Sequence, residues 1–287
     1  MVIPRDEWLA RERAHQERAD ALTAEHRERA ARSEKHPVWD FLFTYYSYKP
    51  AQLRRWHPGA GVELAEAPER LAWRWYAAGS ADRAAVPDAA AFALEKAALA
   101  ALIERMLRRT ASRPGQFGCF GLHEWAMVYQ ADEHRHPVPL RLGQAGTDAV
   151  VEGHDLRCTH FDAFRFFTPE AVPRNRTPLT REDQPLFEQP GCLHAGMDLY
   201  KWATKLGPLI PGELLLDSFE LARDIRLLDM QAAPYDLSAW EVVPVRIETA
   251  EGKAEYVRRQ RGFAERGAVL RRALLAAWHG EGAREAA

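Results

Sequence analysis

The stretch "CLHAGMDLYKWATKLGPLIPGELLLDSFELARDIRLLD", residues 192–229, decides the fold class of this chain. On both sides of the short connection at 207–211, apolar residues recur every three or four positions, which is typical of amphipathic helices. Helices joined by so short a link pack as antiparallel neighbours. We therefore predict an antiparallel helical hairpin over 193–231, with helices at 193–206 and 212–231.

Each predicted helix of the hairpin carries a narrow polar stripe. At about 100° per residue, the side chains of one stripe fall within roughly 60° of one another. The stripes consist of His194, Asp198, Lys201 and Lys205 on the first helix, and of Glu213, Asp217, Glu220 and Asp224 on the second. If the stripes face each other, Lys205 pairs with Glu213, and Lys201 pairs with Asp217 or Glu220. Such pairing would neutralise buried charges and is a purely structural explanation.

A functional explanation concerns the other end of the same hairpin, where the polar stripe has no lysine. There His194, Asp198 and Asp224 would converge, with His160 and Asp162 as further neighbours. Carboxylates and histidines gathered in this way indicate a bound cation or strongly shifted pKa values. Both explanations of the stripes stay open at this point.

The rest of the chain also follows a mainly helical pattern. Helices are predicted at 37–48, 89–109, 117–129 and 249–278, and short strands at 62–64, 71–76 and within 137–167. The predicted fold class is therefore mainly α: a compact helical domain with the hairpin and a few short β-strands.

Residues 1–35 differ from the rest of the chain, because they are rich in Arg, Glu and Ala and poor in large apolar residues. Opposite charges recur at helical spacing, as in Glu7 with Arg11 and Glu25 with Arg29, which supports a helix in solvent. We predict a solvated N-terminal helix over 1–35, and then one globular, mainly helical domain over 36–287. Such a helix would be exposed or would contact a partner.

Composition excludes several classes of protein. The formal net charge of −2 offers no strong overall attraction to nucleic acid. The chain has three cysteines, Cys119, Cys158 and Cys192, without a CxxC pair, so a disulfide framework is not expected. The first residues lack the apolar core of a signal peptide, and no apolar run approaches the roughly 18 residues that span a bilayer. We expect a cytoplasmic protein that does not enter a membrane.

A second stretch, "CTHFDAFRFF" at 158–167, sets a histidine and a carboxylate among aromatic residues. If it is a strand, Cys158, His160 and Asp162 share one face. Asp162 is then the first candidate for a catalytic carboxylate, with His160 as its orienting partner. His194 and Asp198 of the hairpin are the other catalytic candidates.

A metal site is a further possibility that the sequence leaves open. The Glu-x-x-His spacing of regular di-iron bundles occurs at Glu12–His15 and at 133–136, but neither lies in an apolar helix. A less regular site for a divalent metal has five candidate ligands: His123, Glu124, His194, Asp198 and Asp224. No cofactor is firmly implied, since phosphate-binding loops and serine nucleophile elbows are missing. Cys192, at a predicted helix start, is a candidate for Cys–His chemistry with His160 or His123.

Four longer motifs carry a resemblance to a known family: "EKHPVWDFLFTYYSYKPAQLRRWHPGAG" at 34–61, "GCFGLHEWAMVYQ" at 118–130, "LRCTHFDAFRFFTP" at 156–169 and "QPGCLHAGMDLYKWATKLGP" at 189–208. From about residue 34 to 275 the chain resembles an actinobacterial family of uncharacterised proteins commonly labelled 3-methyladenine DNA glycosylase. No catalytic residues are assigned in that family, so none is carried over.

The resemblance implies an enzyme of glycosylase type, which hydrolyses the bond between a base and its sugar in DNA, a nucleoside or a nucleotide. That chemistry needs a carboxylate, for which Asp162 is the candidate, and aromatic rings that sandwich the base. The candidate substrate-binding residues are Trp39, Tyr45, Tyr46, Arg165 and Tyr200.

The chain departs from the helix-hairpin-helix glycosylases at "LIPGELLLD". It keeps Pro211 and Gly212 but has Leu214 where the second glycine would approach a DNA phosphate, and Asp229 and Asp236 bracket the expected place of the catalytic Asp. Two alternatives to a glycosylase therefore stay open. One is a metal-dependent helical enzyme that uses the histidines and carboxylates, and the other is a non-enzymatic interaction protein that uses the N-terminal helix.

Overall fold

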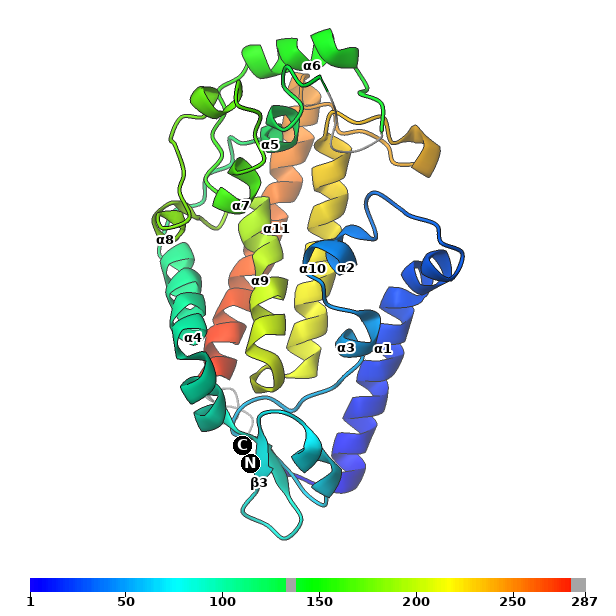
Figure 1. Ribbon diagram of the computed structural model, residues 1–287, viewed down its shortest axis with the longest axis vertical. Helices are drawn as coiled ribbons and strands as arrows, with labels where there is room; N and C mark the ends of the chain where they lie inside the picture. Colours follow the sequence, from blue (N-terminus) through cyan, green and yellow to red (C-terminus); the bar gives the residue numbers. More distant parts are fainter. Residues whose placement is uncertain (133–137, 280–287) are drawn as a thin grey trace. The chain divides into compact units, whose positions relative to one another are not determined.

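The computed structural model describes residues 1–132 and 138–279, and these residues are mainly helical (Figure 1). The α-helices are α1 (Arg5–Ala31), α2 (Phe41–Tyr45), α3 (Pro50–Leu53), α4 (Ala89–Ala111), α5 (Leu122–Ala126), α6 (Gly143–Glu152), α7 (Phe161–Phe164), α8 (Gln184–Phe187), α9 (Leu193–Leu206), α10 (Gly212–Ala232) and α11 (Ala250–Trp278). Four short 3-10 helices are η1 (Pro68–Ala72), η2 (Val172–Arg174), η3 (Gly207–Leu209) and η4 (Ser238–Trp240). The mainly-α prediction is confirmed.

The described residues form two compact units whose segments alternate along the chain. Unit 1 comprises Met1–Leu107, Leu199–Ala222 and the described residues from Val269 onward. Unit 2 comprises Arg108–Asp198 and Arg223–Ala268. This division differs from the predicted boundary at residue 35, because each unit collects segments that are distant in sequence. The helices α4, α9, α10 and α11 contribute residues to both units.

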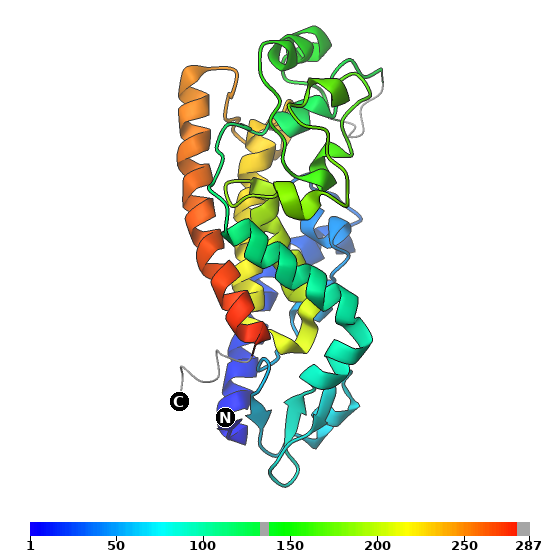
Figure 2. The ribbon, with the colours of Figure 1, turned by 90° about the vertical axis from the view of Figure 1, so that its left-hand side faces the viewer.

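The predicted hairpin is present, with bounds close to the prediction. In unit 1, the rings of Tyr200 on α9 and Phe219 on α10 have centroids 5.3 Å apart. In unit 2, Gly196 faces Ile225, since a Cβ built on Gly196 would lie 2.7 Å from Ile225 Cδ1. The two pairs run in opposite directions along the helices, so α9 and α10 are antiparallel. They lie side by side in Figures 1 and 2.

The acidic stripe of α10 pairs with arginines of α1, which the sequence did not predict. In unit 1, Glu213 Oε1, for which Lys205 was the predicted partner, lies 3.0 Å from Arg11 Nη2. Arg18 Nη2 lies 2.7 Å from Asp217 and 2.8 Å from Glu220. These three residues of the stripe therefore face α1, a helix distant in sequence, which the periodicity of the hairpin alone could not reveal.

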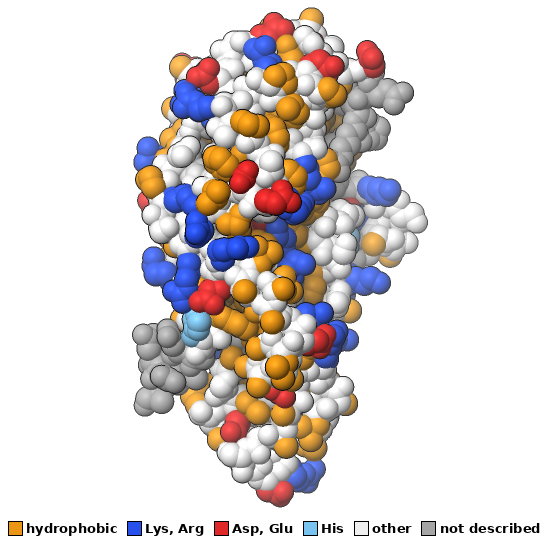
Figure 3. Space-filling model, turned by 60° about the vertical axis from the view of Figure 1, so that its left-hand side comes forward, with side chains coloured by type: hydrophobic (Ala, Val, Ile, Leu, Met, Phe, Trp, Pro, Cys, Tyr) orange, Lys and Arg blue, Asp and Glu red, His pale blue; other side chains and the backbone are white. Residues whose placement is uncertain are grey.

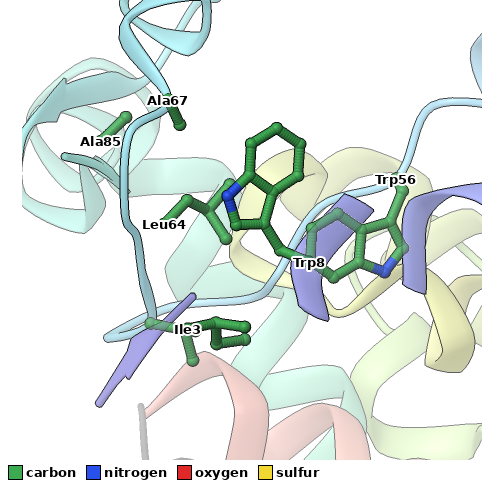
Figure 4. Close-up of a cluster of buried hydrophobic side chains, with 7 residues drawn as sticks. Ile3, Trp8, Trp56, Leu64, Ala67 and Ala85 are labelled. Atoms are coloured by element: carbon green, nitrogen blue, oxygen red, sulfur yellow. The ribbon is translucent and has the colours of Figure 1, made fainter. Parts of the chain in front are cut away.

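The N-terminal helix is packed in unit 1 instead of standing in solvent as predicted. Trp8, His15, Ala19 and Thr23 of α1 are buried. Trp8 joins the apolar cluster of Figure 4, which consists of Ile3, Trp8, Trp56, Val62, Leu64, Ala67 and Ala85. The indole Nε1–H of Trp8 also donates to the Ala65 carbonyl at 2.9 Å. The buried stripe of α1 is narrow and holds small and polar residues, so it left little apolar signal in the sequence.

Unit 1 also contains a small four-stranded sheet. The strands are β1 (Val2–Ile3), β2 (Glu63–Leu64), β3 (Tyr76–Ala78) and β4 (Ala85–Pro87), in the order β1-β2-β4-β3. The β1–β2 pair is parallel, with Val2 opposite Glu63, and the other pairs are antiparallel. The strand predicted at 62–64 is confirmed as β2. The strand predicted at 71–76 is wrong, because η1 occupies its start and β3 begins only at Tyr76.

Other predicted elements are correct in part. α4 is confirmed, and so is α11, whose cap Thr249 accepts the Gly252 N–H at 3.0 Å. The helix predicted at 117–129 shrinks to α5, because Phe120 (φ 50°) and Gly121 (φ 73°) adopt left-handed conformations. The helix predicted at 37–48 shrinks to α2, and Pro50 begins α3 instead of only ending a helix.

No strand lies in the described part of 137–167, where α6 and α7 are found instead. Glu133 and His136 of the second Glu-x-x-His spacing lie outside the described residues. Among the residues described, no helix combines the length and the apolar character that crossing a bilayer requires.

Candidate metal centre

Six side chains of the types that bind metal ions gather in unit 2, in two groups of three. Within each group the histidine nitrogens and carboxylate oxygens lie within 4.8 Å of one another. The groups are His123, His194 and Asp229, and His160, Glu188 and Asp198. His194 is partly exposed and the other five are buried. We call these six residues the histidine–carboxylate cluster.

The first group joins α5 to α10. His123 Nε2 lies 2.8 Å from Asp229 Oδ1, and both side chains are almost fully buried. Arg226, one turn before Asp229 on α10, donates from Nη1 to Asp229 Oδ2 at 3.0 Å. The same Nη1 lies 3.3 Å from Glu124 Oε1. Arg226 therefore fixes one oxygen of Asp229 and leaves the other oxygen turned toward His123.

The second group joins the start of α7, the end of α8 and α9. His160 Nε2 lies 3.1 Å from Glu188 Oε1 and 3.3 Å from Asp198 Oδ2. All three residues are buried. Gln184, four residues before Glu188, donates to the same carboxylate oxygen. Two carboxylates thus converge on one imidazole nitrogen, which is the arrangement that an ion bound by all three would produce.

His194 connects the two groups. Its ring centroid lies 4.5 Å from that of His123 and 5.2 Å from that of His160. His194 and Asp198 are four residues apart on α9, so they occupy the same face of that helix. The polar stripe predicted on the first helix of the hairpin therefore supplies one residue to each group.

The local sequence explains how His160 enters the cluster. Leu156, Cys158 and His160 are buried while Arg157 is exposed, so the segment alternates as an extended chain does. The strand considered for 158–167 is nevertheless not formed, because α7 begins at Phe161. The expected alternation applies up to His160 and ends there.

That change of conformation separates Asp162 from its predicted partner. The Asp162 carboxylate accepts a hydrogen bond from Arg181 Nη2 at 2.8 Å, and Arg165 Nε lies 3.4 Å from the same oxygen. His160 instead faces Glu188 and Asp198. These contacts give both arginines a structural role beside Asp162, and they do not support the predicted orienting role of His160.

Burial and neighbouring charges shift the pKa values in the first group. Burial lowers the pKa of His194 to about 3, helped by the positive charge of His123. Burial also acts to lower the pKa of His123, but Asp229 outweighs it and the pKa lies well above its usual value. Burial opposes ionisation of Asp229, yet His123 holds its pKa below the usual range. Without a metal the pair is therefore imidazolium and carboxylate, and metal binding would displace the proton.

A cysteine thiol lies next to the first group. Cys119 Sγ lies 3.6 Å from His123 Nδ1, on the side of the ring opposite Asp229. The sequence drew attention to Cys192 as the candidate thiol, but burial raises the pKa of Cys192 well above its usual value. Cys119 contacts the imidazole of a cluster histidine, His123, whereas Cys158 Sγ donates to the backbone carbonyl of His160 at 3.5 Å.

The structure brings together most of the predicted metal ligands and adds three: His160, which was predicted as a catalytic residue, Glu188 and Asp229. His123, Glu124, His194 and Asp198 lie in or beside the cluster. Asp224 does not, because it pairs with Arg266 at 2.8 Å. Glu188 was missed entirely, and Asp229 was considered only as a helix-hairpin-helix residue. The sequence did contain an indication of Asp229, because Arg226 and Asp229 are three residues apart on an apolar helix. Glu188 follows a four-residue helix, which is too short to show a periodic pattern.

The predicted base-binding aromatic residues lie in unit 1. The ring centroids of Tyr45 and Tyr46 are 5.0 Å apart, and those of Tyr46 and Tyr200 are 5.5 Å apart. Trp39 belongs to the same unit, and Arg165 belongs to unit 2. In comparisons with known proteins, no family model, no curated protein and no solved structure matches this chain.

Proposed function

We propose that this protein is a metal-dependent enzyme whose histidine–carboxylate cluster binds two divalent metal ions. The observation that carries the proposal is the convergence of ligand atoms in two adjacent groups of three. Two atoms that bind one ion at about 2.0–2.2 Å lie at most about 4.4 Å apart. The 4.8 Å limit within each group is close to that value, so small side-chain adjustments would complete both sites.

The donor set favours transition metals. Imidazole nitrogens combined with carboxylate oxygens suit iron, manganese, cobalt and zinc, whereas magnesium and calcium prefer oxygen ligands alone. Three protein ligands in each group leave positions for water or substrate, which is typical of catalytic sites and not of closed structural ones. A metal ion in such a site lowers the pKa of bound water and polarises substrate oxygens.

The protein residues would provide the frame for that chemistry. Asp198 and His194 are fixed by α9, and Asp229 is oriented by Arg226 through its second oxygen. Gln184 orients Glu188 by donating to Oε1, the carboxylate oxygen that also faces His160. Partners behind the ligands set the direction of each donor atom, and their loss weakens metal binding in known sites.

The test is elemental analysis of the full chain after exposure to iron, manganese, cobalt or zinc and removal of free metal. We expect about two equivalents of one of these metals in the wild type and clearly less in His194→Ala and Asp198→Asn. Asp224→Asn is the matched control, because Asp224 is a carboxylate on α10 that pairs with Arg266 outside the cluster. Less than about a tenth of an equivalent in the wild type, with each metal tried, would refute the proposal.

The resemblance to the glycosylase family suggests the substrate class to assay first. Three of the motifs that carry the resemblance also contain cluster residues: His123 in "GCFGLHEWAMVYQ", His160 in "LRCTHFDAFRFFTP", and His194 and Asp198 in "QPGCLHAGMDLYKWATKLGP". Cleavage of a base–sugar bond would then use water activated at the cluster. Asp162 would keep its ion pairs with Arg165 and Arg181.

The assay is release of free base from alkylated DNA and from a panel of nucleosides and nucleotides, with metal-loaded protein. Release that is lost in Asp198→Asn but kept in Asp162→Asn would support this assignment. No release from any of these substrates would end the glycosylase proposal and leave the metal proposal to its own test. Basic and acidic side chains are interspersed on the face shown in Figure 3. The formal net charge of −2 offers no strong overall attraction to DNA, so nucleosides are the better first substrates.

A further inference from the structure

A hollow of about 810 Å³ opens on unit 2. One wall is the loop before α5, with Gly118, Phe120 and Leu122, and the other is formed by the end of α6 and the residues after it, from Glu152 to Arg157. Arg174 of η2 also lines it. A volume of this size suits a metabolite-sized ligand.

Both walls continue along the chain into cluster residues, His123 and His160, which are buried and are not among the residues that line the hollow. The first wall ends at Leu122, which directly precedes His123. The second wall ends at Arg157, and His160 follows three positions later. The walls touch at Gly118, since a Cβ built there would lie 3.6 Å from Arg157 Nη1. A molecule in the hollow would therefore lie against the two segments that present His123 and His160, one histidine from each group.

Two arginines, Arg157 and Arg174, line the hollow together with two carboxylate residues, Glu152 and Asp155. Arg174 Nη2 donates to the Glu152 carbonyl at 3.2 Å, and within 1–132 and 138–279 its guanidinium has no carboxylate oxygen closer than 4.0 Å. Arg157 Nη2 pairs with Asp155 at 2.9 Å, but the Asp155 side chain is 70% exposed. Exposed pairs of this kind contribute little to stability, so an incoming anion can replace Asp155.

Phe120 supplies an apolar surface beside the arginines. Its backbone is held in the left-handed region at φ 50°, which is unfavourable for an aromatic residue. The following Gly121 also has a positive φ, and a Cβ there would lie 3.2 Å from the Cβ of Ala232. The close packing of Gly121 thus fixes the turn that places Phe120 at the hollow and Cys119 at His123.

We propose that this hollow binds the substrate through an anionic group, a phosphate or a carboxylate, held by Arg157 and Arg174 with Phe120 against an apolar part. Guanidinium groups match the geometry of both anions and bind them with two hydrogen bonds. That the occupant is a substrate rests on the proposed metal-dependent function. The anion site itself depends only on the contacts of the hollow.

The experiment is calorimetric titration of the full chain with inorganic phosphate and, separately, with acetate at low ionic strength. We expect the wild type to bind one of them, and Arg157→Met and Arg174→Met to weaken that binding about tenfold or more. Arg176→Met is the matched control, because Arg176 also lies near Asp155, at 3.8 Å, but does not line the hollow. The anion that binds more tightly identifies the group.

Three results would overturn the anion site: no binding of either anion, unchanged binding in Arg157→Met and Arg174→Met, or an equal loss in Arg176→Met. Metal content is measured in every variant and is expected to match the wild type. A chain that binds the anion in this way but takes up no metal would refute the metal centre and leave the anion site standing. A chain that takes up two metal ions but binds neither anion would refute the anion site and leave the metal centre standing.

Discussion

At the scale of the residue, the contacts between histidine nitrogens and carboxylate oxygens define the cluster. His123 and His160 both direct Nε2 to carboxylate oxygens, at 2.8 Å and 3.1–3.3 Å. Sequence alone identified His194 and Asp198, because polar residues on an apolar helix face need partners, and His160, because it stands among aromatic residues. It could not identify the partners, since the contacts join residues as far apart as 106 positions.

Cys119 is expected to act through His123. With Nε2 of His123 committed to the metal, Nδ1 carries the hydrogen and donates to Cys119 Sγ, which orients the ring. Cys119→Ala should weaken metal affinity about tenfold, and Cys119→Ser should restore most of it, because a hydroxyl also accepts a hydrogen bond. Competition with a chelator measures both. Equal affinity in the alanine variant and the wild type would contradict this role.

His57 of unit 1 should make stability depend on pH. Burial lowers its pKa to about 3, and the nearby charge of Arg70 adds to the shift, while the ring bonds to the Tyr76 hydroxyl at 3.0 Å. Because the unfolded state takes up the proton first, the stability that the neutral ring contributes is present above about pH 6.5 and is lost as the pH falls toward 3.

The measurement is urea unfolding at pH 7 and pH 5. Since one pKa unit corresponds to about 1.4 kcal/mol, the wild type should lose about 2 kcal/mol more between these values than His57→Asn. Asn keeps a polar group for Tyr76 but does not titrate. The same loss in both proteins would show that His57 is not the group responsible.

At the scale of the element, sequence periodicity succeeded where a helix has one wide apolar face. The hairpin α9–α10, α4 and α11 were predicted within a few residues, because each is long and strongly patterned. It failed for α1, whose buried face holds Trp8, His15, Ala19 and Thr23 and has little apolar content. It also failed for 117–129 and 158–167, where left-handed residues and short helices replace regular elements.

The packing of α1 predicts a large effect for Trp8. Trp8→Ala removes a side chain that is 1% exposed and bonded to the Ala65 carbonyl, so we expect a loss of about 3–5 kcal/mol in the free energy of unfolding. Glu17→Ala, on the exposed side of α1, should change it by less than about 0.5 kcal/mol. Chemical denaturation compares them, and similar small effects of both would mean that α1 is the solvated helix that its composition suggested.

The close approach of α9 and α10 at Gly196 can be tested by a double-mutant cycle. Gly196→Ala should destabilise the wild type by about 1–2 kcal/mol, because the added Cβ meets Ile225 Cδ1. In an Ile225→Val background that atom is missing, and the same change should stabilise the protein by up to about 1 kcal/mol, because alanine is favoured over glycine inside a helix. An equal cost in both backgrounds would place the strain elsewhere.

At the scale of the whole molecule, the metal proposal depends on one unit. All six cluster residues belong to unit 2, although they come from five separate stretches of the chain. The hollow with Arg157 and Arg174 belongs to the same unit. Sequence could supply the residues but not their convergence, because Glu188 and Asp229 become neighbours of the histidines only through the tertiary fold. The mainly-α class, by contrast, followed from local pattern alone.

The most direct test of the two-metal centre is a crystal of the cobalt- or zinc-loaded chain, with anomalous difference density measured at the metal absorption edge. We predict two peaks in unit 2, one within about 2.3 Å of ligand atoms of His123, His194 and Asp229, the other likewise beside His160, Glu188 and Asp198. Well-ordered side chains at both groups with no peak at either, or with metal bound only elsewhere, would contradict the account.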